Sequence, residues 1–243
     1  MKKVSFVSEN LTLDAVIFLP KKVKDKNAAI LFVHGWTSRK DRSYQYAKAL
    51  SEMGYICLLF DMRGHGESNG DINSFTIKEF LDDVLASYDY LLTVKGVDKD
   101  NISAVGSSFG GYLVALLTKK RNVKNLVLRV PADYPNEDFN NIKATSSHED
   151  HLIAAWRKKT KKSSETYALD ALNNFRGNVL IIESELDDVI PHETIENYKN
   201  AMVDKQNLTH IIMKGAQHSI KEGKFRDEVE KILKDWFRSR LYL

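Results

Sequence analysis

Short apolar runs recur along the chain, and they are nearly continuous in Ile, Leu, Val and Phe instead of alternating with polar residues. Strands that are buried on both faces of a parallel sheet have this pattern. Six runs are predicted as such strands: Ala29–Val33, Tyr55–Phe60, Ile102–Val105, Leu126–Val130, Val179–Ile182 and Thr209–Met213. Ahead of them, Val4–Val7 and Leu11–Leu19 flank the polar turn Ser8-Glu9-Asn10, which predicts an antiparallel hairpin.

Segments with helical periodicity lie between these runs. Between Phe60 and Ile102, eight apolar residues share one helical face: Ile77, Phe80, Leu81, Val84, Leu85, Tyr88, Leu91 and Leu92. Thr76 and Glu79 have the spacing of a capping box at its start. A second amphipathic segment, from Phe225 to Trp236, predicts a C-terminal helix. The repeated strand–helix order indicates an α/β fold with a mostly parallel eight-stranded sheet and helices on both faces.

Residues 134–175 break this order, because they contain no good strand and are mostly polar. They include the basic run Trp156-Arg157-Lys158-Lys159-Thr160-Lys161-Lys162, which we interpret as a solvated helix face and not as a nucleic-acid or lipid patch. The segment is too long for a plain loop, so we expect an insertion with helices of its own. We predict a single α/β domain over residues 1–243, with 134–175 as a short helical cap over the binding site.

Composition narrows the class of protein. The 243 residues are 43% hydrophobic and 28% charged, which is typical of an ordinary globular chain. A net charge of +3 is too small, over this length, to indicate a nucleic-acid partner. One cysteine excludes an internal disulfide framework and is compatible with a reducing compartment, so we expect a cytoplasmic location. We expect neither a signal peptide nor an integral membrane segment.

The strongest chemical signal is Gly106-Ser107-Ser108-Phe109-Gly110, which fits Gly-x-Ser-x-Gly. It follows the run Ile102–Val105 and precedes a helix-like segment, as a nucleophile elbow requires. Small neighbours let strand and helix approach closely around a strained turn. Of the two adjacent serines, only Ser108 has Gly at both −2 and +2, so Ser108 is the candidate nucleophile.

A serine nucleophile needs a base, and the base needs a carboxylate to orient it. His218 follows the last predicted strand by the short loop Lys214–Gln217, which directs it to the C-terminal edge of the sheet. Asp187 and Asp188, in the loop after Val179–Ile182, both qualify as the acid, and Asp133 is a weaker candidate. Among the remaining histidines, His210 is expected to be structural, and His148 with His151 is expected to be a surface pair and not a metal site.

An oxyanion hole needs two backbone N–H groups beside the nucleophile. The residue after the nucleophile, Phe109, supplies one. The segment His34-Gly35-Trp36 follows the strand Ala29–Val33, and its glycine lets the backbone turn an N–H inward, so Trp36 is the predicted second donor.

Five motifs now stand in order along the chain: His34-Gly35-Trp36, Asp61-Met62-Arg63-Gly64-His65-Gly66-Glu67-Ser68, Gly106–Gly110, Asp187-x-x-Ile190-Pro191 and Gly215-Ala216-Gln217-His218. Together they resemble the α/β-hydrolase superfamily, and within it small short-cap bacterial esterases of the cinnamoyl/feruloyl type and serine-aminopeptidase-like hydrolases. The resemblance implies that Asp187 is the acid, and that Arg63 and His65 shape the site without reacting. The chain departs from the family at Ser107 and Phe109, where members often have His or Gln beside the nucleophile.

These observations predict a serine hydrolase that cleaves small carboxylic esters of short-chain or aryl acids through an acyl-enzyme on Ser108. Trp36, Phe109 and Trp156 are expected to contact the substrate, and no metal or organic cofactor is expected. A thioesterase, a peptidase or amidase with the same triad, or a non-catalytic small-molecule receptor are the alternatives, since the fold does not decide among them.

Overall fold

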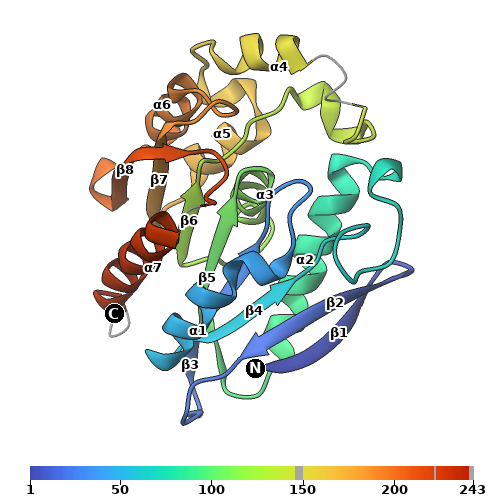
Figure 1. Ribbon diagram of the computed structural model, residues 1–243, viewed down its shortest axis with the longest axis vertical. Helices are drawn as coiled ribbons and strands as arrows, with labels where there is room; N and C mark the ends of the chain where they lie inside the picture. Colours follow the sequence, from blue (N-terminus) through green and yellow to red (C-terminus); the bar gives the residue numbers. More distant parts are fainter. Residues whose placement is uncertain (146–149, 222, 241–243) are drawn as a thin grey trace.

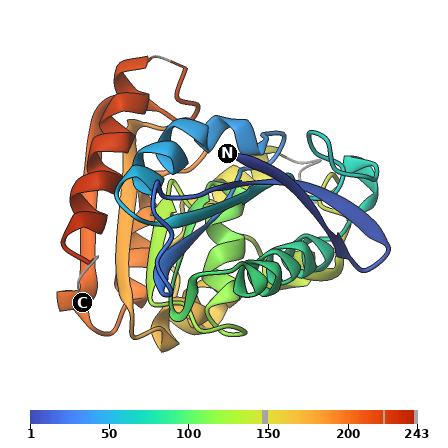
Figure 2. The same ribbon diagram turned by 90° about the horizontal axis from the view of Figure 1, so that it is seen from below.

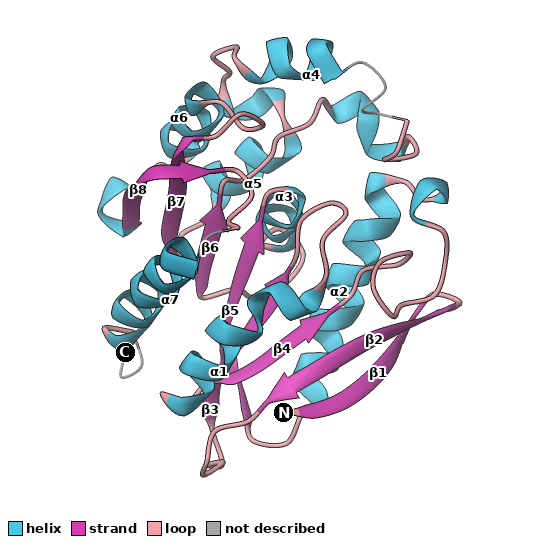
Figure 3. Cartoon of the chain, in the orientation of Figure 1, coloured by secondary structure: helices cyan, strands magenta, loops and turns pink. Residues whose placement is uncertain are grey.

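The computed structural model describes residues 1–145, 150–221 and 223–240 (Figures 1 and 3). Its strands are β1 (Lys2–Ser8), β2 (Leu11–Phe18), β3 (Asn27–Val33), β4 (Ile56–Phe60), β5 (Val97–Ser107), β6 (Asn125–Arg129), β7 (Asn178–Leu186) and β8 (Leu208–Gln217). They form one sheet in the order β1-β2-β4-β3-β5-β6-β7-β8. Strand β2 is antiparallel to both of its neighbours, β1 and β4. All the other neighbouring strands, from β4 and β3 through to β7 and β8, are parallel. The predicted fold class, with its N-terminal hairpin, is confirmed.

Helices cover both faces of the sheet, and Figure 2 shows the two layers. The α-helices are α1 (Tyr44–Glu52), α2 (Ile77–Thr93), α3 (Phe109–Leu117), α4 (Asp150–Arg157), α5 (Tyr167–Asn174), α6 (His192–Ala201) and α7 (Gly223–Arg238). The short 3₁₀ helices are η1 (Lys40–Ser43), η2 (Ile72–Ser74), η3 (Asn136–Asn140), η4 (Ser163–Glu165) and η5 (Lys205–Asn207). Helices α2, α3, α5 and α6 pack into one apolar core, and α1 and α7 into the other on the opposite face. None of the helices that the structure describes is long and apolar enough to cross a membrane.

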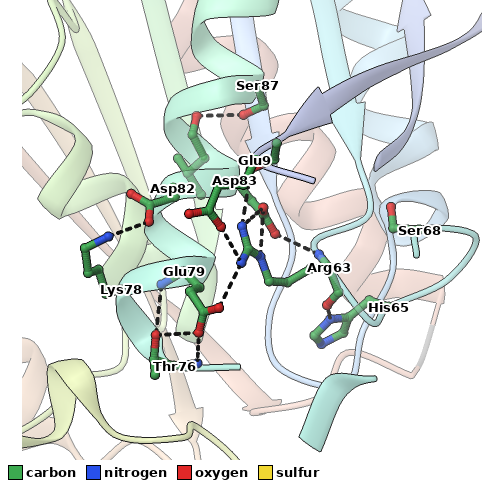
Figure 4. Close-up of polar contacts among 12 residues, drawn as sticks. Glu9, Arg63, His65, Ser68, Thr76, Lys78, Glu79, Asp82, Asp83 and Ser87 are labelled. Carbon is green, nitrogen blue, oxygen red and sulfur yellow. Dashed lines mark hydrogen bonds and ion pairs between the residues drawn. The ribbon is translucent and has the colours of Figure 1, made fainter. Parts of the chain in front are cut away.

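The start of α2 has the predicted capping box. The Thr76 hydroxyl accepts a hydrogen bond from the Glu79 amide at 3.2 Å, and the Glu79 carboxylate accepts one from the Thr76 amide at 2.8 Å (Figure 4). Two of the backbone N–H groups that a helix start leaves unpaired are thereby satisfied.

Strands β7 and β8 are longer than their apolar runs predict. The stretches 183–186 and 214–217, predicted as loops, continue the strands to Leu186 and Gln217. The pairing of these two strand ends is irregular, with a register shift between Ser184 and Leu186. Gly215 has a positive φ of 72°, a backbone conformation that favours glycine. The prediction was wrong here because backbone pairing, and not side-chain hydrophobicity, holds these polar strand ends.

The insertion, residues 134–175, contains η3, α4, η4 and α5, and its described part contains no strand. Figure 1 shows α4 beyond the C-terminal ends of the central strands. The basic run is only partly the solvated face that we expected. Arg157 is buried and donates to the carbonyl oxygens of Asp133 and Val189, each at 3.4 Å. The Lys161 ammonium lies 3.8 Å from the centre of the Trp156 ring.

Candidate active site

Ser108 occupies a strained turn between β5 and α3. Its φ of 53° and ψ of −116° are unusual for a residue that has a side chain. A Cβ on Gly106 would lie 2.3 Å from the Gly110 carbonyl oxygen, and one on Gly110 would lie 2.3 Å from that of Val33. The two flanking glycines are therefore required by close backbone contact, which is the physical reason for the Gly-x-Ser-x-Gly pattern.

The structure brings Ser108, His218 and Asp187 together from three separate strand ends. His218 Nε2 lies 3.1 Å from Ser108 Oγ, and His218 Nδ1 lies 2.8 Å and 3.0 Å from the two carboxylate oxygens of Asp187. The imidazole ring thus bridges the hydroxyl and the carboxylate. This is the arrangement in which a histidine can take a proton from a serine.

Backbone hydrogen bonds orient the Asp187 carboxylate. Its Oδ1 accepts from the amides of Val189 at 2.9 Å and Ile190 at 2.7 Å. The neighbouring Asp188 is exposed. Asp133 is buried elsewhere, where one carboxylate oxygen accepts from the Tyr134 amide and the other has no hydrogen-bond partner in the described structure. Burial raises the pKa of the Asp133 carboxyl to about 7.

Two neutral histidines brace the loop that carries Trp36. His34 Nδ1 lies 2.8 Å from the Gly35 carbonyl oxygen, while its Nε2 accepts from the Met62 amide at 3.0 Å. Burial lowers the pKa of His34 to about 4, so the ring is neutral at pH 7 and Nδ1 carries the proton that it donates. The His34 contact fixes the plane of the Gly35–Trp36 peptide, because a trans peptide directs its N–H opposite to its C=O.

The second of these histidines is His65. Its Nε2 accepts from the Thr37 amide at 3.3 Å, and its Nδ1 lies 2.9 Å from the Arg63 carbonyl oxygen. Burial lowers its pKa as well. The Trp36 ring packs edge-on against the His65 ring at a centroid distance of 5.3 Å. His65 therefore positions the backbone and the indole ring of the loop from the side.

The loop at residues 61–68 is anchored by a buried ion-pair cluster around Arg63 (Figure 4). The guanidinium donates to Asp83 Oδ1 from Nε at 3.0 Å and from Nη2 at 2.7 Å, and to Glu9 at 3.0 Å. The Glu79 carboxylate lies 3.4 Å away. Moving Arg63 away from these carboxylates would leave a buried charge without compensation. The cluster therefore holds the loop in place, and with it His65.

A pocket of about 730 Å³ opens beside Ser108. Trp36 and His218 line it. Phe109, whose side chain is fully buried, and Trp156, whose ring contacts the Lys161 ammonium, are not among the residues that line this pocket. The Lys143 ammonium lies over the rings of Trp36 at 4.8 Å and Phe109 at 5.6 Å. Sequence reasoning missed Lys143, because no local pattern distinguishes it from other lysines of the insertion.

Two further histidines, His210 and His192, contact a different carboxylate, that of Glu183. His210 pairs with Glu183 at 2.7 Å, and His192 approaches the same carboxylate at 2.6 Å. His148 lies outside the described residues, and so does the side chain of His151, so the pair expected at the surface is not placed. Within the described ranges, no group of three or more His, Cys, Asp or Glu side chains is arranged to hold a metal ion.

Known protein families and curated proteins resemble this chain at the level of sequence. The sequence model of the prolyl oligopeptidase family matches residues 41–242. An uncharacterized Escherichia coli protein, YcjY, is 29% identical over 154 residues, which are 58% of this chain and 50% of that one. The human mitochondrial palmitoyl-protein thioesterase ABHD10 is 29% identical over 150 residues, which are 60% of this chain and 47% of that one. The chain thus spans about half the length of the curated relatives it matches.

Solved structures resemble it over nearly the whole length. Est1E from Butyrivibrio proteoclasticus, in a structure with ferulic acid bound, superimposes with a TM-score of 0.77 at 19% identity. The match covers 99% of this chain and 100% of that one. At this identity the likeness establishes a shared α/β-hydrolase fold.

Proposed function

The chain belongs to the prolyl oligopeptidase family within the α/β-hydrolase superfamily, and from this premise we propose that it is a serine hydrolase of carboxylic esters. The observation that supports the proposal most directly is the continuous contact from Ser108 through His218 to Asp187. A receptor that only binds a small molecule would not require this chain of contacts.

In the proposed reaction, His218 takes the proton of Ser108 Oγ as the oxygen attacks the acyl carbon. The same imidazolium then returns the proton to the leaving alkoxide, and the acyl group remains on Ser108. Water, deprotonated by His218, attacks the acyl-enzyme, and the acid leaves as His218 returns that proton to Ser108 Oγ. Asp187 holds the imidazole in the required tautomer and stabilises its positive charge.

The proposed oxyanion hole consists of the Trp36 and Phe109 amides. Neither amide donates a hydrogen bond to another of the residues described, so both are free to bind a developing oxyanion. The Phe109 amide is also the first N–H of α3, where the helix dipole favours negative charge.

We further propose that residues 134–175 act as a cap over this site within one domain, residues 1–243. Lys143 and Tyr134 of the insertion lie against the rings of Trp36 and Phe109. Those contacts place described residues of the insertion against the aromatic side chains of the two proposed oxyanion donors, and we propose that this packing favours short-chain or aryl acids. Contact of Trp156 with the substrate remains a prediction from the sequence.

A series of 4-nitrophenyl esters from acetate to palmitate, with methyl ferulate beside it, tests the proposal. We expect kcat/KM to be highest for short or aryl acyl groups and to fall beyond about eight carbons. In a pocket that buried each added methylene, each one would stabilise the transition state by about 0.8 kcal/mol and raise kcat/KM about fourfold. A maximum at the long-chain end would contradict the short-acyl preference.

A thioesterase is the second candidate, because the human relative is named a palmitoyl-protein thioesterase. Acyl-coenzyme A substrates matched in acyl length to the esters decide between the two. The ester proposal expects kcat/KM for the oxygen ester to equal or exceed that for the thioester, and the reverse order would favour the thioesterase.

A further inference from the structure

The pocket beside Ser108 is strongly cationic. It extends from the nucleophile between the sheet and the helices α1 and α7. Among the residues that the structure describes, its lining includes five basic residues, Arg39, Arg42, Arg129, Lys221 and Arg226, and one acidic residue, Asp41. Asp41 already pairs with Arg39 at 2.5 Å. The pocket therefore has an excess of positive charge directly beside the candidate nucleophile.

Arg129 is the central cation of this pocket. It ends β6 and points to the same side of the sheet as Ser107, to whose hydroxyl its Nη1 donates at 3.0 Å. Its Nη2 donates to the His218 carbonyl oxygen at 2.6 Å. Arg129 thus contacts the side chain beside the nucleophile and the main chain of the candidate base, and it lines the same pocket as Ser108.

The guanidinium is incompletely satisfied. Its Nε is shielded from solvent and has no hydrogen-bond partner in the described structure, and none of the described carboxylates forms an ion pair with it. Burial lowers the pKa of Arg129, and the charge of the Asp187 carboxylate, which forms no ion pair with the guanidinium, offsets only part of this effect. A guanidinium has five donors in a planar fork that matches a carboxylate or phosphate, and two of those of Arg129 donate to residues that the structure describes.

Two further side chains complete the site. Tyr46 of α1 and Arg226 of α7 line the same pocket from the helix layer. Burial raises the pKa of the Tyr46 phenol, so its hydroxyl remains a hydrogen-bond donor. No ion pair engages Arg226 among the residues that the structure describes. Three side chains that donate hydrogen bonds, the cations Arg129 and Arg226 and the neutral phenol of Tyr46, therefore line the same pocket as Ser108.

We infer that this pocket is an anion subsite, in which Arg129, with Tyr46 and Arg226, binds a carboxylate or phosphate group carried by the substrate. The inference rests on the proposed function, and it defines the substrate class of that site as anionic esters. Because the charge is partly desolvated, its attraction for an anion is stronger than that of an exposed arginine.

Two matched pairs of esters test the subsite. Mono-(4-nitrophenyl) glutarate and 4-nitrophenyl valerate have the same acyl length and differ by the terminal carboxylate. 4-Acetoxybenzoate and 4-methylphenyl acetate place the same difference on the alcohol side. We expect kcat/KM for the anionic member to exceed that for the neutral member at least tenfold in one pair. A ratio at or below one in both pairs would overturn the inference, while hydrolysis of the neutral esters would leave the proposed function standing.

Variants separate anion binding from a structural role. Arg129→Met and Arg226→Ala should each lower the anionic-to-neutral ratio of kcat/KM at least threefold. Loss of a merely structural contact would slow both members of a pair equally and leave the ratio unchanged, which would contradict the inference. Arg238→Ala is the matched control, because Arg238 lies on the same helix, exposed and about 18 Å along the axis from Arg226. It should leave the ratio unchanged.

A binding measurement covers the case in which no ester is turned over. Titration calorimetry with glutarate and with inorganic phosphate should give saturable binding to the wild-type protein, weakened at least tenfold in Arg129→Met and weakened in Arg226→Ala. The tighter of the two probes identifies the source of the anion as a carboxylate or a phosphate. Equal binding of both probes to wild type and to both variants, or no binding at all, would overturn the subsite.

Discussion

Leu186, the last residue of β7, pairs with Gln217, the last residue of β8, and Asp187 and His218 directly follow the two strand ends. This one pairing brings the carboxylate to the imidazole, since neighbouring parallel strands lie only about 4.8 Å apart. The register shift just before it corrects the alignment of the two strand ends. The acid–base contact of the candidate site is thus a consequence of sheet register.

The identity of the nucleophile is tested by covalent labelling. A fluorophosphonate probe should add one label to the wild-type protein, because the contact of Ser108 Oγ with His218 Nε2 is expected to activate the hydroxyl. Ser108→Ala should remain folded and take up no label, as mass spectrometry would show. Ser107→Ala is the matched control, because its hydroxyl contacts Arg129 and not His218. Labelling that persists in Ser108→Ala would refute the assignment.

The identity of the acid is tested by two neighbouring substitutions. Asp187→Asn should lower kcat about 10³- to 10⁴-fold, because an amide at this position favours the wrong imidazole tautomer. Asp188→Asn should have little effect, because that carboxylate is exposed. Circular dichroism checks that both variants are folded. A reversed order of the two effects would mean that Asp188 is the acid.

The role of His34 is tested through transition-state stabilisation. His34→Ala removes one of two hydrogen bonds to the Gly35 carbonyl oxygen, leaving that from the Ser38 amide at 3.1 Å, and so loosens the peptide that carries the Trp36 amide. We expect kcat to fall about 10²-fold, the magnitude typical of a lost oxyanion donor, with a smaller change in KM. A change confined to KM would show that the Trp36 amide does not stabilise the transition state.

The buried Asp133 carboxyl makes stability depend on pH. Its pKa is raised to about 7 in the folded protein, against 3.8 when exposed, so the folded state binds more protons between these values. Its contribution to stability is present below pH 3.8 and is lost as the pH rises to about 7. Asp133→Asn should therefore gain stability relative to wild type between pH 4 and pH 8, by up to about 4 kcal/mol.

Urea unfolding of both proteins at several pH values in this range measures the difference. Asp188→Asn, at an exposed carboxylate, is the control and should track the wild type. A constant difference between Asp133→Asn and wild type across the range would show that Asp133 titrates normally.

Several features could be predicted because their cause is local in sequence. The apolar runs specify strands that are buried on both faces, and the Thr76–Glu79 spacing specifies the start of α2. The glycines around Ser108 are needed wherever that turn forms, so the elbow was recognisable as a pattern. The order of the five motifs then identified the superfamily.

Other features depend on which strand ends meet, and no local pattern contains that information. Sequence alone left Asp187 and Asp188 as equal candidates until the family resemblance was used, and β7–β8 register places Asp187 at His218. Arg129 lies within the predicted run Leu126–Val130, where no pattern marks it, and its guanidinium without an ion pair becomes apparent only in the folded chain, where it contacts Ser107 and His218. Short-range periodicity therefore determined the elements and the reactive residue types. Tertiary structure decided which carboxylate reaches the base and which charge is left without a partner, because register and burial arise only when distant segments pack.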